Sequence, residues 1–485
     1  MRVLFLASEV DGLIKTGGLA DVAKVLPIEL QKRDIDVSVM LPCYPQVKAL
    51  VVPGEAPIEL TMHLGSQHYI YRIYKISGQE VPVYAIDYEP YFNRDRPYDD
   101  GNHGYADNGE RFAFFTLAAL QACQMLNLKP NIVHSNDWHT ALAPFFIKTV
   151  LADNSFFAET RSVLSIHNGA YQGSYDLNSI PFAHTFSQYT EEGMYDSYNM
   201  FNFLKCGVLY ADAINAVSKS YAEELTTPLG GHYMSHIFQR RKDALVGILN
   251  GCDYGEWDTE NDPHLIANYS ATDLSGKAKC KQDLQQQLNL PEDPNLPLFA
   301  MVSRFTDQKG FSLLVPALAD FLASSDAQVA IVGSGETAIC DALTALAKRY
   351  PNRFGLFIGY SDALSHQAQA GADYFLMPSI FEPCGLTQMF SLAYGSLPVA
   401  REVGGLKDTV IGYNGNNLES ANGITFLNPE PDALYYTMRA ATDLYNESPE
   451  IYLQIQQRAM ATRFLWEKSS AEYIDMYNDV LTHSH

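Results

Sequence analysis

The feature that most constrains this chain is a regular alternation of short apolar runs with longer helical patterns. The runs are bounded by turn residues and have the length and composition of buried strands. Strands that alternate with helices form right-handed βαβ units and a parallel sheet. In the first half the runs are residues 2–8, 36–42, 130–136, 161–168, 211–218 and 243–251, and residues 21–33 carry a helical pattern.

The same alternation restarts in the second half of the chain. We therefore predict an α/β fold made of two doubly wound domains that face a central cleft. Ligands in such sheets bind beyond the carboxyl ends of the strands, so candidate site residues are sought just after the strands. The second set of runs is residues 297–305, 327–335, 353–360, 372–379 and 397–405.

A turn signal at Asn250 and Gly251 sets the predicted domain boundary, because it follows the last strand of the first half. The 485 residues are enough for two or three domains with their own cores. We predict a first domain over residues 1–249, a second over 250–464 and a final segment over 465–485.

The charge balance restricts the partners of this chain. A formal net charge of -23 repels phosphate, so we expect no binding to nucleic acid or to an anionic membrane, and any phosphate site is local. No apolar run approaches the roughly 20 residues of a membrane helix, and the start does not resemble a signal peptide. Seven cysteines without a CxxC pair are typical of reduced thiols rather than of disulfides or a zinc cluster. We predict a cytoplasmic protein.

The loop after the first strand contains Lys15, Gly17 and Gly18 at the predicted start of a helix. A cation beside exposed backbone amides is a way to hold a phosphate. The loop is neither a Walker motif nor a GxGxxG fingerprint. A tight turn with a solvated lysine therefore remains an equal interpretation at this point.

Arg304 and Lys309 follow the first strand of the second half. A departing diphosphate gains negative charge as its bond to a sugar breaks, and two fixed cations stabilise that charge most in the transition state. Such a site needs no metal ion. Two unrelated surface cations are the alternative interpretation.

Glu382 follows another strand, with Pro383 and Gly385 after it. We predict that Pro383 occupies the first turn of a helix, so that the Glu382 carboxylate is presented at a helix N-terminus facing the cleft and binds sugar hydroxyls. Glu382 as a partner of the helix dipole alone is the alternative. For Cys384 a small buried side chain is favoured over a reactive thiol.

Asp137, His139 and His167 lie at two further predicted strand ends. A neutral His167 ring can hydrogen-bond a sugar hydroxyl, and Asp137 can orient a group near an anomeric carbon. The spacing does not supply three convergent metal ligands, so no metal site is predicted. A structural histidine is the alternative for either ring.

Together these segments form a series that resembles the bacterial glycogen synthases and plant starch synthases. The resemblance covers essentially the whole chain, with the motifs in family order, and KTGGL with EPCGL is its most specific part. The motifs are KTGGLADV at 15–22, DWH at 137–139, HNGAYQG at 167–173, NGCD at 250–253, SRFTDQKG at 303–310, FEPCGLTQ at 381–388, GGLKDTV at 404–410 and WEKSSAEY at 466–473.

The resemblance implies a GT-B glycosyltransferase with two Rossmann-like domains. It implies transfer of glucose from ADP-glucose to the non-reducing end of an α-1,4-glucan, glycogen or a malto-oligosaccharide, with retention of configuration and no cofactor beyond the sugar nucleotide. The first domain would bind the acceptor and the second the nucleotide sugar. The last helix, from Trp466 onward, would cross back to the first domain.

The resemblance also implies the roles of the site residues. Arg304 and Lys309 would neutralise the diphosphate, with Lys15 approaching it from the other domain. Asp137 and His167 would contact the transferred glucose, and Glu382 would line the donor pocket. The further substrate-binding residues would be Gly17, Gly18, Asp21, His139, Asn168, Asn250, Cys384, Gly385, Leu386, Thr387, Gly404 and Gly405.

Two questions stay open on the sequence. Retention fits front-face attack, in which the leaving phosphate takes the acceptor proton, but a covalent intermediate on Asp137 or Glu382 is the alternative. Gly12, Ile380 and Val403 replace the Pro, Arg and Thr that are usual in the family, which leaves the choice between ADP-glucose and UDP-glucose open. A UDP-glucose-dependent GT-B enzyme and an inactive glucan-binding protein are the rival functions.

Overall fold

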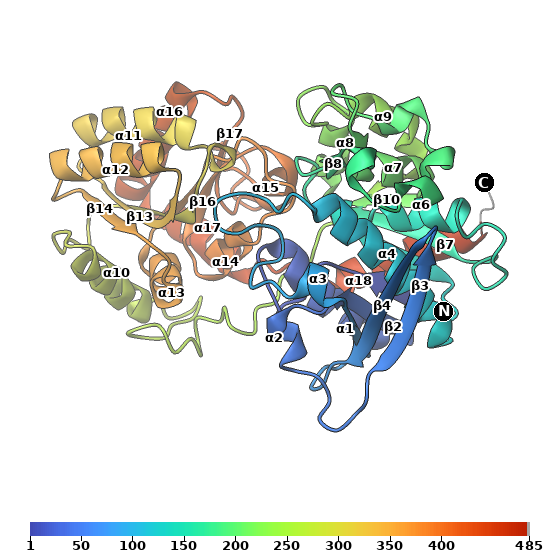
Figure 1. Cartoon of the computed structure of the whole chain (residues 1–485). Helices are drawn as coiled ribbons and strands as arrows, with labels where there is room; N and C mark the ends of the chain where they lie inside the picture. Colours follow the sequence, from blue (N-terminus) through green and yellow to red (C-terminus); the bar gives the residue numbers. More distant parts are fainter. Residues whose placement is uncertain (483–485) are drawn as a thin grey trace. The chain divides into compact units, whose positions relative to one another are not determined.

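The computed structural model describes residues 1–482 and folds into two α/β units (Figure 1). Unit 1 comprises residues 1–250 together with the described part of the chain from Trp466 onward, and unit 2 is Gly251–Leu465. Residues 483–485 of the predicted final segment lie outside the described residues. Both units are built on parallel strands with helices between them, so the predicted α/β fold of two doubly wound domains is confirmed.

Unit 1 is built on a nine-stranded sheet in the order β11-β10-β7-β6-β1-β2-β5-β4-β3. The strands from β11 to β5 are all parallel, and β1 lies between β2 and β6. The nine strands are β1 (Arg2–Leu6), β2 (Asp36–Pro42), β3 (Ile58–Leu64), β4 (Gln67–Lys75), β5 (Val83–Asp87), β6 (Ile132–Asn136), β7 (Arg161–Ile166), β10 (Ala213–Ala216) and β11 (Leu245–Gly247).

The edge of this sheet departs from the predicted parallel arrangement. β3 and β4 form an antiparallel hairpin, and β4 also runs antiparallel to β5. Only Gly65 and Ser66 separate the paired residues Leu64 and Gln67, and a two-residue turn of this kind joins antiparallel neighbours directly. Parallel neighbours need a longer crossover, so the short turn decides the direction of β4.

The helices of unit 1 connect these strands. The first, α1, begins at Gly18 as predicted and buries Leu19, Val22 and Leu26. Helix α1 ends at Gln31, and strands β8 (Ser174–Tyr175) and β9 (Phe201–Asn202) form a separate two-stranded antiparallel ladder. The remaining α-helices are α2 (Pro45–Lys48), α3 (Glu89–Phe92), α4 (Asn108–Met125), α5 (Asp137–Thr140), α6 (Leu142–Lys148), α7 (Phe203–Tyr210), α8 (Lys219–Leu225), α9 (Ser235–Arg240) and α18 (Trp466–Thr482).

Helix α18 is attached to unit 1 by a buried polar network. Tyr477 Oη lies 2.7 Å from Nδ1 of His134 on β6, and His134 Nε2 lies 2.7 Å from Ser165 Oγ on β7. Asn215 on β10 donates to Ser165 Oγ and to Tyr473 Oη. Burial lowers the pKa of His134 to about 3, so the ring is neutral and both nitrogens need partners. The network joins three strands to the last helix.

Unit 2 contains a six-stranded sheet, entirely parallel, in the order β14-β13-β12-β15-β16-β17. Its strands are β12 (Leu298–Phe305), β13 (Gln328–Gly335), β14 (Phe354–Ile358), β15 (Tyr374–Met377), β16 (Leu397–Arg401) and β17 (Ile424–Phe426). Its α-helices are α10 (Ser275–Gln287), α11 (Phe311–Ser324), α12 (Thr337–Arg349), α13 (Asp362–Gly371), α14 (Thr387–Ala393), α15 (Gly404–Thr409), α16 (Pro431–Glu447) and α17 (Pro449–Ala461).

Both faces of this sheet are covered. Phe299 of β12 packs in one apolar cluster with Leu318 of α11 and Met438 of α16. Its neighbour Ala300 points the other way and packs in a second cluster with Leu284 of α10 and Leu406 of α15. Side chains that alternate between two buried faces explain why the strand runs read as continuous apolar segments.

Within residues 1–482, no helix combines the length and the apolar character that crossing a bilayer requires.

The α18 network predicts the effect of one hydroxyl group. Tyr477→Phe leaves a buried His134 nitrogen without its partner, which costs about 1–3 kcal/mol of folding free energy. We expect the melting temperature of unit 1 to fall by several degrees in calorimetry, while Tyr436→Phe, at an exposed site on α16, leaves both units unchanged. An unchanged melting temperature in Tyr477→Phe would show that the network does not hold α18.

Candidate functional site

Asp137 follows β6 and adopts a left-handed backbone conformation, with φ of 52°. Such strain in a non-glycine residue is often associated with function. Its Oδ1 accepts the N–H of His167 at 2.7 Å and that of Asn168 at 3.3 Å. The HNG segment after β7 is therefore held against the DWH segment after β6, as expected for neighbouring parallel strands.

The acid–base state of this pair is set by burial. Burial raises the pKa of Asp137 to about 7, against the two amide hydrogen bonds, and the nearby Glu9 carboxylate adds to the increase. Burial lowers the pKa of His167 to about 3. His167 is therefore neutral at pH 7, and its Nε2 lies 2.8 Å from Asn136 Oδ1. A neutral ring suits a hydrogen bond to an uncharged sugar hydroxyl.

His139 is packed rather than presented. Its ring stacks on Tyr98 at 4.5 Å between centroids and contacts Trp138 at 4.2 Å. Burial holds the pKa of His139 well below its ordinary value. Its Nδ1 is buried and has no hydrogen-bond partner among the described protein atoms.

The loop that precedes α1 carries a charged cluster. Lys15 Nζ lies 2.6 Å from Asp21 Oδ1 and 3.4 Å from Asp11 Oδ1, and about half of its side chain is exposed. The helix has Gly17 at its N-cap and no side-chain cap, so its first amides face the loop uncapped. An anion bound at this point would contact both the uncapped amides and Lys15, which already forms an ion pair with Asp21.

Glu9 is a member of this site that the sequence reasoning did not select. Its Oε2 accepts the N–H and the hydroxyl of Thr16, both at 2.6 Å. Burial raises the pKa of Glu9 to about 7, with a contribution from Asp21. An acidic residue at the end of an apolar strand run was the available signal. Glu9 interacts electrostatically with Asp21 and with Asp137, and so connects the two loops.

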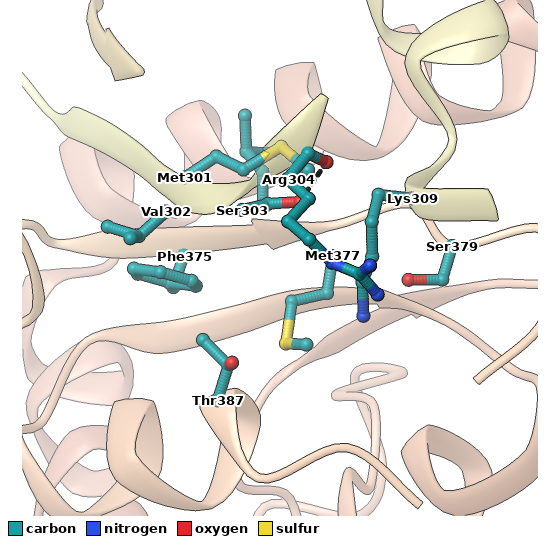
Figure 2. Close-up of a pocket in the computed structure, with 10 residues that line it drawn as sticks. Met301, Val302, Ser303, Arg304, Lys309, Phe375, Met377, Ser379 and Thr387 are labelled. Atoms are coloured by element: carbon teal, nitrogen blue, oxygen red, sulfur yellow. Dashed lines mark hydrogen bonds between the residues drawn. The ribbon is translucent and has the colours of Figure 1, made fainter. Parts of the chain in front are cut away.

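Unit 2 contains a cavity of about 180 Å³ at the carboxyl ends of β12 and β15. Figure 2 shows Arg304 and Lys309 extending toward the end of the cavity at Ser379, with Phe375 and Thr387 toward the other end. The full lining is Met301, Val302, Ser303, Arg304, Lys309, Phe375, Leu376, Met377, Ser379 and Thr387. Two predicted cations thus share one cavity, whose apolar lining the sequence did not indicate.

The two cations differ in their partners. Lys309 Nζ lies 2.6 Å from Glu382 Oε2, which also accepts the Ser379 hydroxyl at 3.0 Å. Arg304 is exposed and pairs with no carboxylate within the described chain. Gly310 follows Lys309 with φ of 81°, and a Cβ there would lie 1.9 Å from the Pro378 carbonyl oxygen. This close approach brings the lysine loop against the strand that leads to Glu382.

The prediction that Pro383 lies in the first turn of a helix is wrong. α14 begins at Thr387, and Glu382 lies in the loop before it. Gly385 has φ of 74°, outside the helical region, and Gln388 donates to the carbonyl oxygens of Cys384 and Gly385. These carbonyls are satisfied by a side chain, so the helix starts later. Glu382 is consequently fixed by its pair with Lys309 and not by a helix terminus.

The remaining predicted residues of unit 2 gather around the same loop. The Gly405 N–H donates to the Glu382 carbonyl oxygen at 2.9 Å, so α15 docks on the EPCG segment. Gly404 and Cys384 are buried beside it, and Leu386 leads into α14. Asn250 is separate from this group, because it belongs to unit 1, where it is buried.

The two departures from the family pattern in unit 2 lie on this loop and its neighbour. The Ile380 N–H donates to the Gln308 carbonyl oxygen, and its own carbonyl oxygen accepts Arg401 Nη1 at 2.6 Å. Val403 is buried at the N-cap of α15, where it offers no hydroxyl. The Arg401 guanidinium from β16 thus lies against the backbone of the segment that contains Ile380.

The raised pKa values of Glu9 and Asp137 predict a pH-dependent stability. In the folded state both carboxyls keep their protons up to about pH 7, whereas in the unfolded chain they lose them near 4. The stabilisation is complete below pH 4 and is lost as pH rises through 7, and one such shift corresponds to about 3 kcal/mol. This contribution falls between about pH 4 and pH 7. The lowered pKa values of His134 and His167 act in the opposite direction below about pH 6.5, so the carboxyl contribution is measured as the difference in melting temperature between the wild type and a variant that lacks one carboxyl.

Glu9→Gln should gain melting temperature relative to the wild type in calorimetry as pH rises from about 4 to about 7, because the amide does not ionise. Glu59→Gln, which neutralises an exposed carboxylate on β3, should keep a constant difference from the wild type over the same pH range. An equal pH dependence in both variants would rule out Glu9 as its source.

Family models match both units of the chain. Residues 2–240 match the starch synthase catalytic domain, and residues 281–452 match the glycosyl transferases group 1 domain. Among solved structures, the catalytic domain of starch synthase IV from Arabidopsis thaliana, bound to ADP and acarbose, superposes with a TM-score of 0.87 at 28% identity, covering 99% of each chain. Sucrose-phosphate synthase from Thermosynechococcus elongatus shares the fold at a TM-score of 0.59 and 16% identity, over all of both chains.

Curated relatives match over their whole length. Glycogen synthase from Aeromonas salmonicida is 49% identical over 99% of this chain and 98% of its own. Glycogen synthase from Vibrio parahaemolyticus is 44% identical over 99% of both chains. With the motif loops gathered at the strand ends of two Rossmann-like units, this level of identity over the full length shows that the chain belongs to the glycogen synthase family.

Proposed function

We propose that this chain transfers glucose from ADP-glucose to the non-reducing end of an α-1,4-glucan, glycogen or a malto-oligosaccharide. The observation that carries the proposal is the convergence of Arg304 and Lys309 on one cavity at the strand ends of unit 2. Two cations at that place match the charge of a departing diphosphate. Membership of the family and the ADP and acarbose bound to the starch synthase neighbour support the same donor and acceptor classes.

In this proposal the leaving group is stabilised in unit 2. Lys309 is held by Glu382, which fixes the ammonium group without moving it out of reach, and Arg304 supplies a second charge that no carboxylate of the described chain neutralises. Both interactions gain strength as negative charge develops on the diphosphate, so they favour the transition state over the bound donor. Donor-pocket positions would be Glu382, Cys384, Gly385, Leu386, Thr387, Gly404 and Gly405.

The proposed contribution of unit 1 is to the transferred sugar and the acceptor. Neutral His167 and the fixed Asp137 would contact the glucose ring, and Lys15 would approach the diphosphate. The other substrate-binding positions of this side would be Gly17, Gly18, Asp21, His139, Asn168 and Asn250. The corresponding domain roles are acceptor binding for residues 1–249 and nucleotide-sugar binding for 250–464, with 465–485 returning to the first domain.

Retention is proposed to proceed by front-face attack. Asp137 accepts two backbone N–H groups and has a pKa raised to about 7 by burial, which weakens it as a nucleophile. Glu382 is occupied by Lys309 and Ser379. With both carboxylates engaged, the leaving phosphate is the base that takes the acceptor proton, and no covalent glucosyl enzyme forms. The sugar nucleotide is the one small molecule required, and the proposed compartment is the cytoplasm.

The proposal is tested by glucose incorporation into glycogen from ADP-glucose and, in parallel, from UDP-glucose. We expect ADP-glucose to be the better donor. A preference for UDP-glucose would leave the proposed reaction unchanged and would indicate that positions such as Ile380 and Val403 set the choice of donor. The variants Ile380→Arg and Val403→Thr would then test these two positions. No incorporation from either donor, with glycogen still bound, would replace the proposal with that of an inactive glucan-binding protein.

Removal of one cation tests the role of the cavity. Lys309→Ala should lower kcat by about 100- to 1000-fold, the usual cost of one preorganised group that stabilises transition-state charge. Lys348→Ala removes the same charge from the exposed face of α12 and should leave kcat unchanged. Calorimetry on both variants controls for folding. Full turnover in Lys309→Ala would exclude it from diphosphate stabilisation.

A further inference from the structure

Unit 2 carries a cluster of three side chains with metal-ligating atoms, His264, Asp362 and His366. One such atom from each lies within 4.8 Å of the others. None of the three lines the cavity that contains Arg304 and Lys309, so the proposed glucosyl transfer gives them no role. We propose that they bind one divalent transition-metal cation, with Zn²⁺ as the fitting ion, and that the ion stabilises unit 2.

Two of the ligands are placed by one helix. Asp362 is the first residue of α13 and His366 follows it by four positions, so both project from the same face. Ser361 caps the helix by accepting the N–H of Leu364, which fixes the turn that holds Asp362. The Asp362 side chain is 62% exposed and that of His366 is buried, so the pair spans from the core to the surface.

The third ligand comes from the connection that precedes α10. The His264 N–H donates to Asp262 Oδ1 at 2.8 Å, and Gln367 Nε2 donates to the His264 carbonyl oxygen at 3.1 Å. The first bond fixes the local turn, and the second fixes the backbone of His264 on α13, while the His264 ring remains partly exposed. His264 Nε2 lies 3.7 Å from Asp362 Oδ2.

The buried histidine is oriented by a carboxylate. His366 Nδ1 lies 2.7 Å from Asp262 Oδ2, which also accepts the Tyr394 hydroxyl at 2.6 Å. Trp257 stacks on the His366 ring at 3.7 Å with an interplanar angle of 10°. With Nδ1 donating to the carboxylate, Nε2 carries the lone pair. A ligating histidine held by a carboxylate on its other nitrogen is the usual arrangement at protein metal sites.

The donor set and the spacing select the ion. Two imidazoles and one carboxylate suit Zn²⁺ and similar divalent transition metals better than Mg²⁺ or Ca²⁺, which prefer oxygen. Ligand bonds of about 2.0–2.1 Å in a tetrahedral site place ligand atoms roughly 3.4 Å apart. The 3.7 Å separation of His264 Nε2 and Asp362 Oδ2 is close to this value. Rotation of these two partly or largely exposed side chains would shorten the separation to the distance that a tetrahedral site requires. Water completes the fourth position.

A bound ion would attach the segment that precedes α10, which contains His264, to helix α13. α13 leads directly into β15, whose residues Phe375, Leu376 and Met377 line the cavity. The proposed site is therefore structural: it anchors a long connection against the helix that precedes a cavity strand.

The test is Zn²⁺ titration of the full-length chain after treatment with a chelator and removal of the chelator. Calorimetric titration should show a saturable site, and Co²⁺ in its place should give the visible absorption of a low-symmetry nitrogen and oxygen site. His264→Ala and Asp362→Asn should each weaken Zn²⁺ binding by more than about 100-fold. Both side chains are partly or largely exposed, so both variants should fold.

The matched control is His68→Ala, which removes an exposed histidine paired with His63 on the β3–β4 hairpin of unit 1 and should keep the affinity. At 100 times Kd, Zn²⁺ should raise the melting temperature of unit 2 in the wild type and in His68→Ala by about 5 °C, and not in the other two variants. Absence of a saturable site, or equal affinity in all four proteins, would overturn the proposal. Neither result depends on glucosyl transfer.

Discussion

The parallel hydrogen-bond ladder at the centre of each sheet is the constraint on which the rest of this molecule depends. β1 pairs with β2 and β6, and β12 pairs with β13 and β15, in each case in the parallel direction. Parallel neighbours end at the same edge, so the loops that follow them meet. Glu9, Asp137 and His167 meet in unit 1 for this reason, and Arg304, Lys309 and Glu382 meet in unit 2.

The electrostatics of the two groups differ because their surroundings differ. In unit 1 burial keeps Glu9 and Asp137 largely protonated up to neutral pH and keeps His167 uncharged, which suits contact with an uncharged sugar. In unit 2 the Glu382 carboxylate pairs with Lys309, whereas the exposed Arg304 pairs with no carboxylate of the described chain. A protein with a net charge of -23 thus keeps a local positive site where a diphosphate is proposed to leave.

Several features were outside the reach of sequence reasoning. The β3–β4 hairpin was missed because its strands alternate apolar and polar residues at an edge, whereas the prediction followed the continuous runs of buried parallel strands. The start of α14 was misplaced, because Gln388 satisfies two carbonyls that a helix would otherwise use. Glu9 and the cluster of His264, Asp362 and His366 depend on contacts between distant segments, which no local pattern reports.

The sequence by itself determined the two-domain α/β fold and the order of the strand ends from which the proposed site residues were chosen. It did so because buried parallel strands and helices differ in period, and because turn residues mark strand ends. Only the tertiary structure decided that Glu382 pairs with Lys309, that burial moves the pKa values of Asp137 and His167 in opposite directions, and that α18 joins unit 1 through His134. These outcomes depend on distances between side chains and on their burial in the folded structure. A local stretch of sequence determines neither, because the residues involved lie far apart along the chain.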